Sequence, residues 1–112
     1  ACSGSMVNKD FENFAGEFIA NGITGYEGFG LYCESRIETT VFIDNQDKKA
    51  IEDPSVAFPY LKNCFFSYQN YTVNQISKEI KFKGAAFKKS TAILSFRRDD
   101  FGKWKLYRYE CY

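Results

Sequence analysis

An apolar stripe near the N-terminus limits which architectures this chain can adopt. Its side chains recur every third or fourth position in residues 8–20, at Phe11, Phe14, Ala15, Phe18 and Ile19. This spacing predicts an amphipathic helix, with Asn8 as its N-cap and Asn21-Gly22 at its C-terminal end. A helix of about three turns is marginal alone in water, so we expect its apolar face to pack on another element.

The rest of the chain supplies strands for that helix to cover. We predict strands over residues 31–43, 64–73, 76–83, 89–98 and 103–111. The sequence Asp99-Asp100-Phe101-Gly102 predicts a hairpin turn between the last two. The predicted fold class is therefore α+β: one N-terminal amphipathic helix packed on a curved antiparallel β-sheet of about five strands. Residues 1–7 are predicted to be a tail, and residues 8–112 a single domain.

Three segments lie between these elements. Residues 22–30 hold four glycines and predict a flexible connector anchored by Tyr26 and Phe29, because the order helix, glycines, strand is the reverse of a phosphate-binding loop. Residues 44–54 predict a polar loop, with or without one helical turn. Residues 56–58, bracketed by prolines, predict an edge or a connection.

In the last predicted strand, residues 103–111, alternation places Trp104 and Leu106 on one face, and Tyr107, Tyr109 and Cys111 on the other.

The formal net charge of +1 conceals an uneven distribution. Residues 1–61 hold four basic and ten acidic residues, whereas residues 62–112 hold eleven basic and four acidic ones. Such asymmetry fits two interpretations. Either the basic half forms a surface for an acidic partner, or the two halves lie beside each other in the folded domain.

The four cysteines are Cys2, Cys33, Cys64 and Cys111. They include no CxxC pair and the chain has no histidine, so we expect no metal site and no cofactor. An even number of cysteines in a small domain favours disulfides, and Cys33, Cys64 and Cys111 are the disulfide candidates because they lie in or beside predicted strands. The alternative is that they are buried thiols of a cytosolic protein.

The N-terminal residues Ala1-Cys2-Ser3-Gly4-Ser5 resemble a processed bacterial lipoprotein, in which a small residue precedes the lipidated cysteine. The pattern departs from that family because cleavage would remove Ala1. Two alternatives stay open: Gly4-Ser5-Met6 as a cloning remnant, or Ala1 as the mature end of a secreted protein. With the cysteine count, the resemblance implies an extracytoplasmic protein, whether periplasmic, lipid-anchored or secreted.

A leading helix followed by an antiparallel meander resembles the cystatin-like and NTF2-like α+β superfamilies. The final hairpin, residues 94–106, is similar to the closing hairpin of many NTF2-like proteins. The resemblance implies a cone-shaped sheet with room for a pocket. The Gln-x-Val-x-Gly motif of cystatins and the His/Asp dyad of some NTF2-like enzymes are both absent from the sequence, so the resemblance implies no inherited activity.

Without histidine the chain lacks the commonest general base, and Glu34 and Glu38 would lie about 13 Å apart on one strand, too far for a glycosidase pair. We therefore predict a non-enzymatic domain that acts by protein–protein contact, as an inhibitor, immunity or accessory protein. The predicted binding residues are Arg97, Arg98, Lys105, Tyr107, Arg108, Tyr109 and Tyr112.

Other interpretations of these residues stay open. One alternative is a small-ligand pocket between helix and sheet. Another is an anionic partner, such as a glycan or a lipid surface, bound by the basic C-terminal strands; a near-neutral net charge disfavours nucleic acid. The tyrosines can also be cross-strand pairs that only stabilise the sheet.

Overall fold

The computed structural model describes residues 10–43, 45–59, 68–84 and 91–111 as an α+β domain. Its elements are α1 (Asp10–Asn21), α2 (Tyr26–Leu31), β1 (Cys33–Ile43), β2 (Gln46–Glu52), β3 (Tyr68–Asn74), β4 (Glu79–Gly84), β5 (Thr91–Arg98) and β6 (Trp104–Cys111). Residues 54–59 form a further helical segment between β2 and β3. The α+β class is confirmed, with three helical segments in the described residues instead of one.

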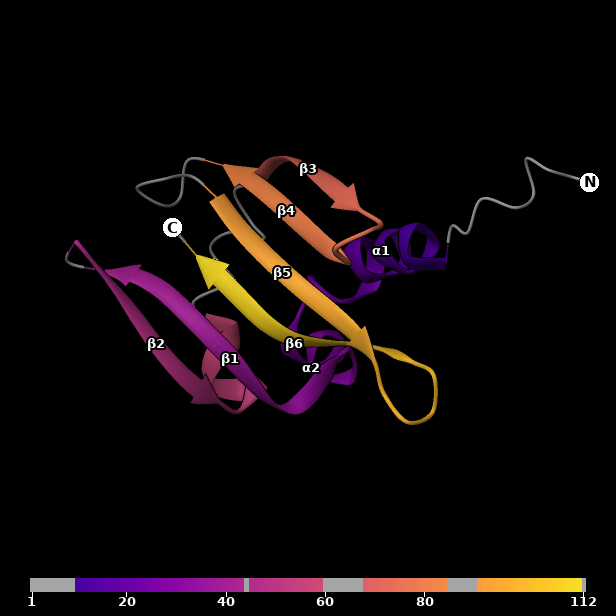
Figure 1. Cartoon of the computed structure of the whole chain (residues 1–112), viewed down its shortest axis with the longest axis horizontal. Helices are drawn as coiled ribbons and strands as arrows, with labels where there is room; N and C mark the ends of the chain where they lie inside the picture. The colour runs from indigo at the N-terminus through magenta and orange to yellow at the C-terminus, as the bar shows by residue number, and fades with distance from the viewer. Residues whose placement is uncertain (1–9, 44, 60–67, 85–90, 112) are drawn as a thin grey trace, which may run out of the picture.

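The strands form a single open sheet with the order β2-β1-β6-β5-β4-β3 (Figure 1). The sheet thus has six strands, where the sequence predicted about five. All neighbouring strands are antiparallel except β1 and β6, which are parallel. The predicted C-terminal meander is confirmed for β3 to β6, but the last strand returns to the middle of the sheet and makes it mixed.

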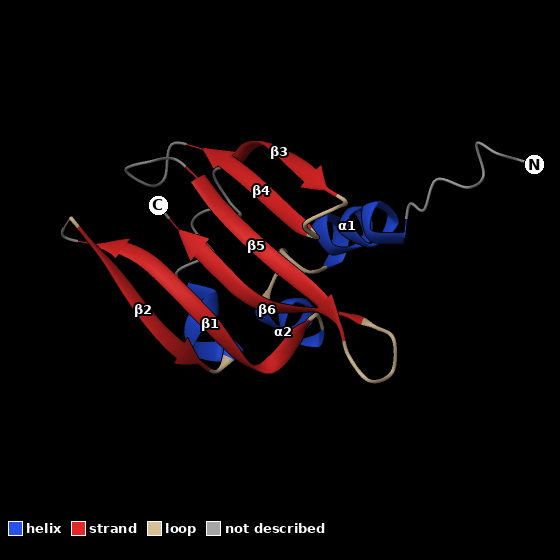
Figure 2. Ribbon diagram, viewed as in Figure 1, coloured by secondary structure: helices blue, strands red, loops and turns tan. Residues whose placement is uncertain are grey.

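The helices lie together on one face of the sheet, and none of the described helices lies on the opposite face (Figure 2). We call these the inner and the outer face. The predicted apolar stripe explains how α1 attaches, because Phe11, Phe14, Ala15 and Phe18 are all buried. Phe14 and Phe18 each lie with their ring centroid 5.2 Å from that of Phe96 in β5. Contacts between aromatic rings of α1 and β5 therefore hold the helix against the sheet.

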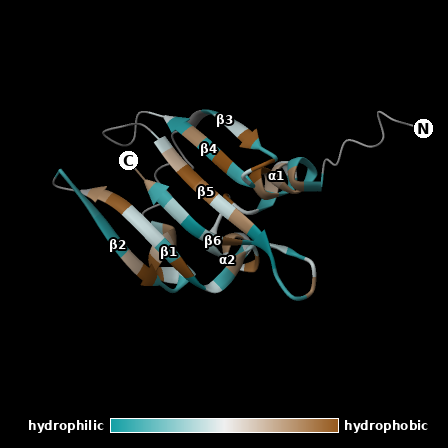
Figure 3. Ribbon diagram, in the orientation of Figure 1, coloured by the Kyte–Doolittle hydropathy of each residue, from teal (hydrophilic) through white to brown (hydrophobic). Residues whose placement is uncertain are grey.

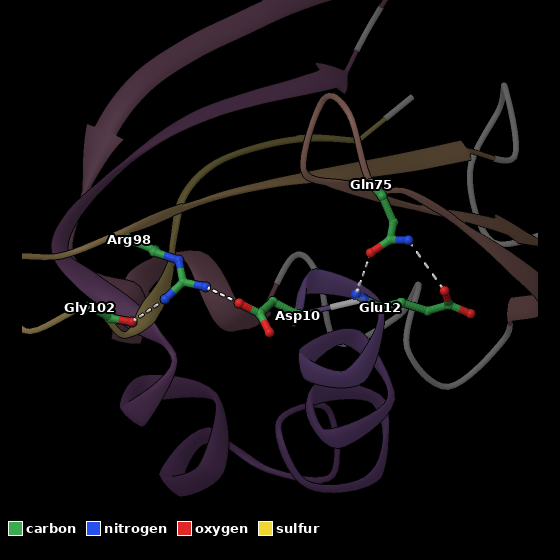
Figure 4. Close-up of polar contacts among 5 residues, drawn as sticks. All are labelled: Asp10, Glu12, Gln75, Arg98 and Gly102. Carbon is green, nitrogen blue, oxygen red and sulfur yellow. Dashed lines mark hydrogen bonds and ion pairs between the residues drawn. The ribbon is translucent and has the colours of Figure 1, made fainter. Parts of the chain in front are cut away.

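The first turn of α1 is held from two sides by polar contacts (Figure 4). Arg98, at the end of β5, donates a hydrogen bond to Asp10 at 2.7 Å and another to the Gly102 carbonyl oxygen at 3.0 Å. Gln75, in the β3–β4 turn, accepts from the Glu12 backbone N–H at 3.3 Å and donates to the Glu12 carboxylate at 3.4 Å. The Gln75 oxygen thus satisfies one of the backbone N–H groups that a helix N-terminus leaves without an internal partner.

The glycine-rich segment is not a flexible connector, because residues 26–31 form α2. Phe29 is fully buried, as an anchor should be, whereas Tyr26 is exposed. A Cβ at Gly28 would overlap the carbonyl oxygen of Asn21, so only glycine lets α2 lie against the end of α1. This close approach, and not phosphate binding, accounts for at least one of the glycines.

The predicted polar loop 44–54 is largely strand β2, and the segment 56–58 is helical. Strand β2 escaped prediction because its residues are exposed on both faces, so no apolar alternation marks it. The helix over 54–59 carried a local signal. Asp53 accepts hydrogen bonds from the backbone N–H and hydroxyl of Ser55, as an N-cap does, and Pro54 occupies the first helical position.

The predicted boundaries of the C-terminal strands need smaller corrections. Residues 76–78 belong to the β3–β4 turn, where Ile76 is almost fully exposed, and the strand begins at Glu79. Gly102 closes the predicted hairpin turn with φ +76°, which confirms the glycine as the residue that permits the turn. Residues 1–9, 60–67 and 85–90 lie outside the described residues, so the predicted tail boundary stays a prediction.

The expected faces of β6 are correct up to Tyr107 and wrong for Tyr109 and Cys111. The register passes from Phe96 opposite Leu106 to Ser95 opposite Arg108, so β6 contains one extra residue at this point. Such a β-bulge reverses the alternation beyond it. Tyr109 and Cys111 consequently face the core with Leu106, and each is fully buried.

The predicted disulfides are wrong where they include Cys33, which is a buried free thiol in β1. Burial raises the pKa of this thiol far above its ordinary value, an effect that the charge of Lys105 only partly offsets. Cys33 is paired with Leu106, five residues before Cys111, so a bridge between the two cysteines would have to span about 16 Å. The candidate Cys64 and the N-terminal Cys2 lie outside the described residues.

Candidate binding surfaces

Three of the predicted binding residues come together on the outer face. The guanidinium carbon of Arg97 in β5 lies 4.4 Å from the ring centroid of Tyr107, and that of Arg108 lies 5.4 Å from it. Both distances are within the range of cation–π attraction. The bulge in β6 allows this arrangement, because it places Tyr107 and Arg108 next to each other on the outer side of one strand.

Glu34 of β1 fixes one end of this arrangement. Its two carboxylate oxygens accept hydrogen bonds from Arg97 Nε at 2.6 Å and from an Arg97 terminal nitrogen at 2.7 Å, a bidentate geometry. This contact with Glu34 raises the pKa of Arg97 further above its ordinary value. We call Glu34, Arg97, Tyr107 and Arg108 the outer-face cluster.

A shallow groove of about 420 Å³ lies beside the cluster, over β2, β1 and β6. Arg108 lines it together with Glu38, Lys49 and Glu110. The Nε–H of Arg108 is buried and has no hydrogen-bond acceptor; Glu110 lies 4.0 Å away, at ion-pair distance only. A buried donor without an acceptor is uncommon in proteins, so Arg108 has unused hydrogen-bonding capacity beside the groove.

Charges that are separated along the sequence alternate in space on this face. Glu38 of β1 is paired with Arg108 of β6, and Glu34 bonds Arg97. The acidic first half and the basic second half of the chain therefore lie beside each other, which is the second of the two interpretations of the charge asymmetry. A surface with both signs fits a protein partner of mixed charge better than a uniform polyanion.

The other predicted binding residues lie elsewhere. Tyr109 is fully buried, its hydroxyl 3.5 Å from the Ala57 carbonyl oxygen, so it belongs to the core and is not an interface anchor. Arg98 stacks on Trp104 at 4.6 Å and holds α1 through its ion pair with Asp10. Lys105 donates to the Leu31 carbonyl oxygen at 2.6 Å, and Tyr112 lies outside the described residues.

A second depression, which sequence reasoning missed, opens on the inner side between α1, the end of α2 and the β5–β6 hairpin. Its volume is about 460 Å³, and we call it the hairpin groove. Aromatic and apolar side chains line it together with three charged ones: Phe14, Leu31, Tyr32 and Trp104, with Glu17, Lys103 and Lys105. It escaped prediction because its walls come from segments that are far apart in the sequence.

Tyr32 is the polar group in the apolar wall of the hairpin groove. Its hydroxyl donates to Glu17 at 3.3 Å. Partial burial, and then the negative charge of Glu17, raise the pKa of Tyr32 above its ordinary value, so the phenol stays protonated near neutral pH. The groove therefore presents an aromatic wall with a fixed hydroxyl and two lysines at its rim.

Metal-binding clusters and membrane-spanning helices are both missing from the described part of the chain. There, no group of three or more histidine, cysteine, aspartate or glutamate side chains is arranged to hold a metal ion. None of the helices found among those residues has the length and apolar character required to cross a membrane.

Comparison with known proteins identifies a fold and no family. No family model and no curated protein matches the chain. Among solved structures, the chain is similar to a designed NTF2-type protein with a long sheet (TM-score 0.55, 11% identity, 94% of this chain and 98% of that one). It is also similar to a protein from de novo design of diverse pocket structures (TM-score 0.52, 11% identity, 91% and 94%).

A DUF4783 family protein from Bacteroides uniformis aligns at a TM-score of 0.48, with 14% identity over 88% of this chain and 92% of that one. The matches to the two designed proteins support an NTF2-like fold, which confirms that part of the resemblance seen in the sequence. The cystatin-like and lipoprotein resemblances stay predictions.

Proposed function

We propose that this chain is a non-enzymatic binding domain that recognises another protein through the outer-face cluster. The observation that carries the proposal is the pair of arginines, Arg97 and Arg108, held over the ring of Tyr107 on the outer face of the sheet. Tyrosine and arginine are the residue types that most often dominate binding energy at protein interfaces. The Glu34–Arg97 contact pre-orders one arginine, which lowers the entropic cost of binding.

The absence of histidine from the whole sequence supports the non-enzymatic part of the proposal. Glu34 is also engaged with Arg97 and is thus less suited to act as a free general base. We further propose an extracytoplasmic location, on the strength of the N-terminal resemblance. Fractionation of the native host, with detection of the full-length protein, tests the location; recovery in the cytosol alone would refute it.

The test of the binding proposal is a matched pair of double variants. Arg97→Ala/Arg108→Ala removes two positive charges from the outer-face cluster, and Lys81→Ala/Lys83→Ala removes two from exposed positions of β4. Proteins captured by the tagged chain from its native host are identified, and binding of each is then measured with purified components. We expect the arginine variant to weaken binding of the true partner by about tenfold or more, and the lysine variant to leave it nearly unchanged.

The proposal fails if every captured protein binds both double variants equally. In that case the cation–π contacts of Tyr107 stabilise the sheet and do not serve recognition. Circular dichroism of the two variants is the control for folding, because all four substituted residues are exposed or half-buried.

A second candidate function is binding of a small apolar anion in the hairpin groove. The aromatic wall, Lys103 and Lys105 favour it, as does the use of related designed folds as pocket scaffolds. Trp104 is the only tryptophan and lines the groove, so its fluorescence reports on occupancy. Anilinonaphthalene sulfonate, an aromatic anion, should receive energy from Trp104 and bind less tightly to Lys103→Ala; no transfer, or equal binding, would dismiss this function.

A further inference from the structure

Strand β2 forms one edge of the sheet, and its outer edge faces no other strand among the described residues (Figure 1). It pairs with β1 over seven consecutive positions, from Ile37 opposite Glu52 to Ile43 opposite Gln46, without a register shift. In an antiparallel pair, alternate residues direct their backbone N–H and C=O groups away from the partner strand. The free edge of β2 therefore offers a regular row of donors and acceptors about 24 Å long.

The opposite edge of the sheet is less regular. Strand β3 has a register shift against β4 between Tyr68 and Asn70, the kind of irregularity that prevents a further strand from pairing. Strand β2 has no such irregularity, and no proline. Its only protective feature is the pair Lys48 and Lys49 at its centre, and β2 is accordingly hydrophilic over much of its length (Figure 3).

The two lysines determine which strand can pair with this edge. If a second copy of β2 paired with it in full antiparallel overlap, Lys49 would lie opposite Lys49 of the other copy, and like charges directly opposite destabilise a sheet. Asp47 directly precedes Lys48, and the exposed Ile51 lies two positions after Lys49. A complementary strand carries acidic residues opposite both lysines, a basic residue opposite Asp47 and an apolar one opposite Ile51.

We propose that the β2 edge binds an extended segment of a partner protein, one with two adjacent acidic residues, by adding it as a seventh, antiparallel strand. Backbone hydrogen bonds supply affinity, and the charges of Lys48 and Lys49 select the segment. This site lies on the edge of the sheet and shares no residue with the outer-face cluster. A segment of the order valine, threonine, two acidic residues and a lysine satisfies all four positions, with threonine opposite Ala50.

The probe is the labelled peptide acetyl-Lys-Val-Thr-Glu-Glu-Lys-Thr-amide, and binding is measured by fluorescence anisotropy. The charge-reversed peptide acetyl-Glu-Val-Thr-Lys-Lys-Glu-Thr-amide should bind about tenfold more weakly or not at all. The variant Lys48→Glu/Lys49→Glu should reverse this preference. Arg97→Ala/Arg108→Ala should leave it unchanged, so that failure of this proposal and failure of the proposed function are distinguished.

Two N-methylated forms of the parent peptide, acetyl-Lys-Val-Thr-Glu-Glu-Lys-Thr-amide, separate strand addition from simple charge attraction. One carries N-methyl groups on its odd residues and the other on its even residues, and only one of these sets points toward β2 in an antiparallel strand. We expect one form to bind like the parent peptide and the other to lose binding. Equal binding of both forms, absence of binding by the parent peptide, or dimerisation of the chain through β2 in sedimentation equilibrium would overturn the proposal.

Discussion

The packing of α1 on the sheet can be tested with two phenylalanines that differ in burial. The Phe18 side chain is fully buried, and its ring centroid lies 5.2 Å from that of Phe96, 5.5 Å from that of Tyr32 and 6.1 Å from that of Phe14. Phe18→Ala removes a ring and leaves a cavity, because the surrounding aromatic rings cannot all move inward. For a Phe→Ala change at such a site we expect a loss of about 3–5 kcal/mol in the free energy of unfolding.

Urea unfolding followed by far-ultraviolet circular dichroism measures this loss. With a denaturant slope of about 2 kcal/mol per molar urea, the midpoint should fall by about 1.5–2.5 M. Phe101 is 87% exposed at the tip of the β5–β6 hairpin, so Phe101→Ala has the same chemistry without the burial. The change that Phe101→Ala causes in the free energy of unfolding should stay within about 0.5 kcal/mol.

Since total stability for a domain of this kind is about 5–15 kcal/mol, Phe18→Ala can unfold the chain outright. Phe18→Leu then keeps the measurement possible, because it leaves a smaller cavity and should give an intermediate loss. A loss below about 1 kcal/mol for Phe18→Ala, or equal destabilisation of the two alanine variants, would show that the Phe18 ring does not hold α1 on the sheet.

Three further predictions concern polar groups. Arg98→Ala should cost about 1 kcal/mol in urea unfolding, because it breaks an exposed ion pair and a contact with Trp104, whereas Arg36→Ala should cost almost nothing. Asp99 accepts the backbone N–H groups of Lys103 and Phe101, which hold the pKa of its carboxyl below the ordinary value. This stabilisation is present above the unfolded pKa of about 3.9 and is lost as the pH falls through the folded one, so acid should destabilise wild type more than Asp99→Asn; equal losses would contradict this. Burial raises the pKa of the Cys33 thiol, so iodoacetamide at pH 8 should modify it only after unfolding, as peptide mass spectrometry will show.

Most of the elements that the sequence predicted share one property, a periodic apolar face. Phe11 to Ile19 form this face in α1, and Ile80 and Phe82 form it in β4. Strand β2 lacks the property because it is exposed on both faces, and α2 was hidden by glycines that serve a close helix contact at Gly28. Periodicity reports burial, so an element without a consistently buried face leaves no signal.

The candidate site was predicted in part for the same reason. Residue type alone singled out Arg97, Tyr107 and Arg108, and the structure brings them together. Tyr109 was misplaced because a single extra residue in β6 reverses the alternation, and a bulge of this kind has no signature in composition. Glu34, which fixes Arg97, lies 63 positions away, a distance over which periodicity gives no information.

The central place of β6 has a consequence for how the chain folds. The β1–β2 hairpin touches the remaining strands only through β6, so residues 33–52 have no neighbour in the larger part of the sheet until residues 104–111 are available. During synthesis the β1–β2 pair therefore cannot join the rest of the sheet until β6 has left the ribosome, whether or not α1 has already formed. Closing so long a loop is slow, and we expect folding to be limited by the parallel joining of β1 to β6.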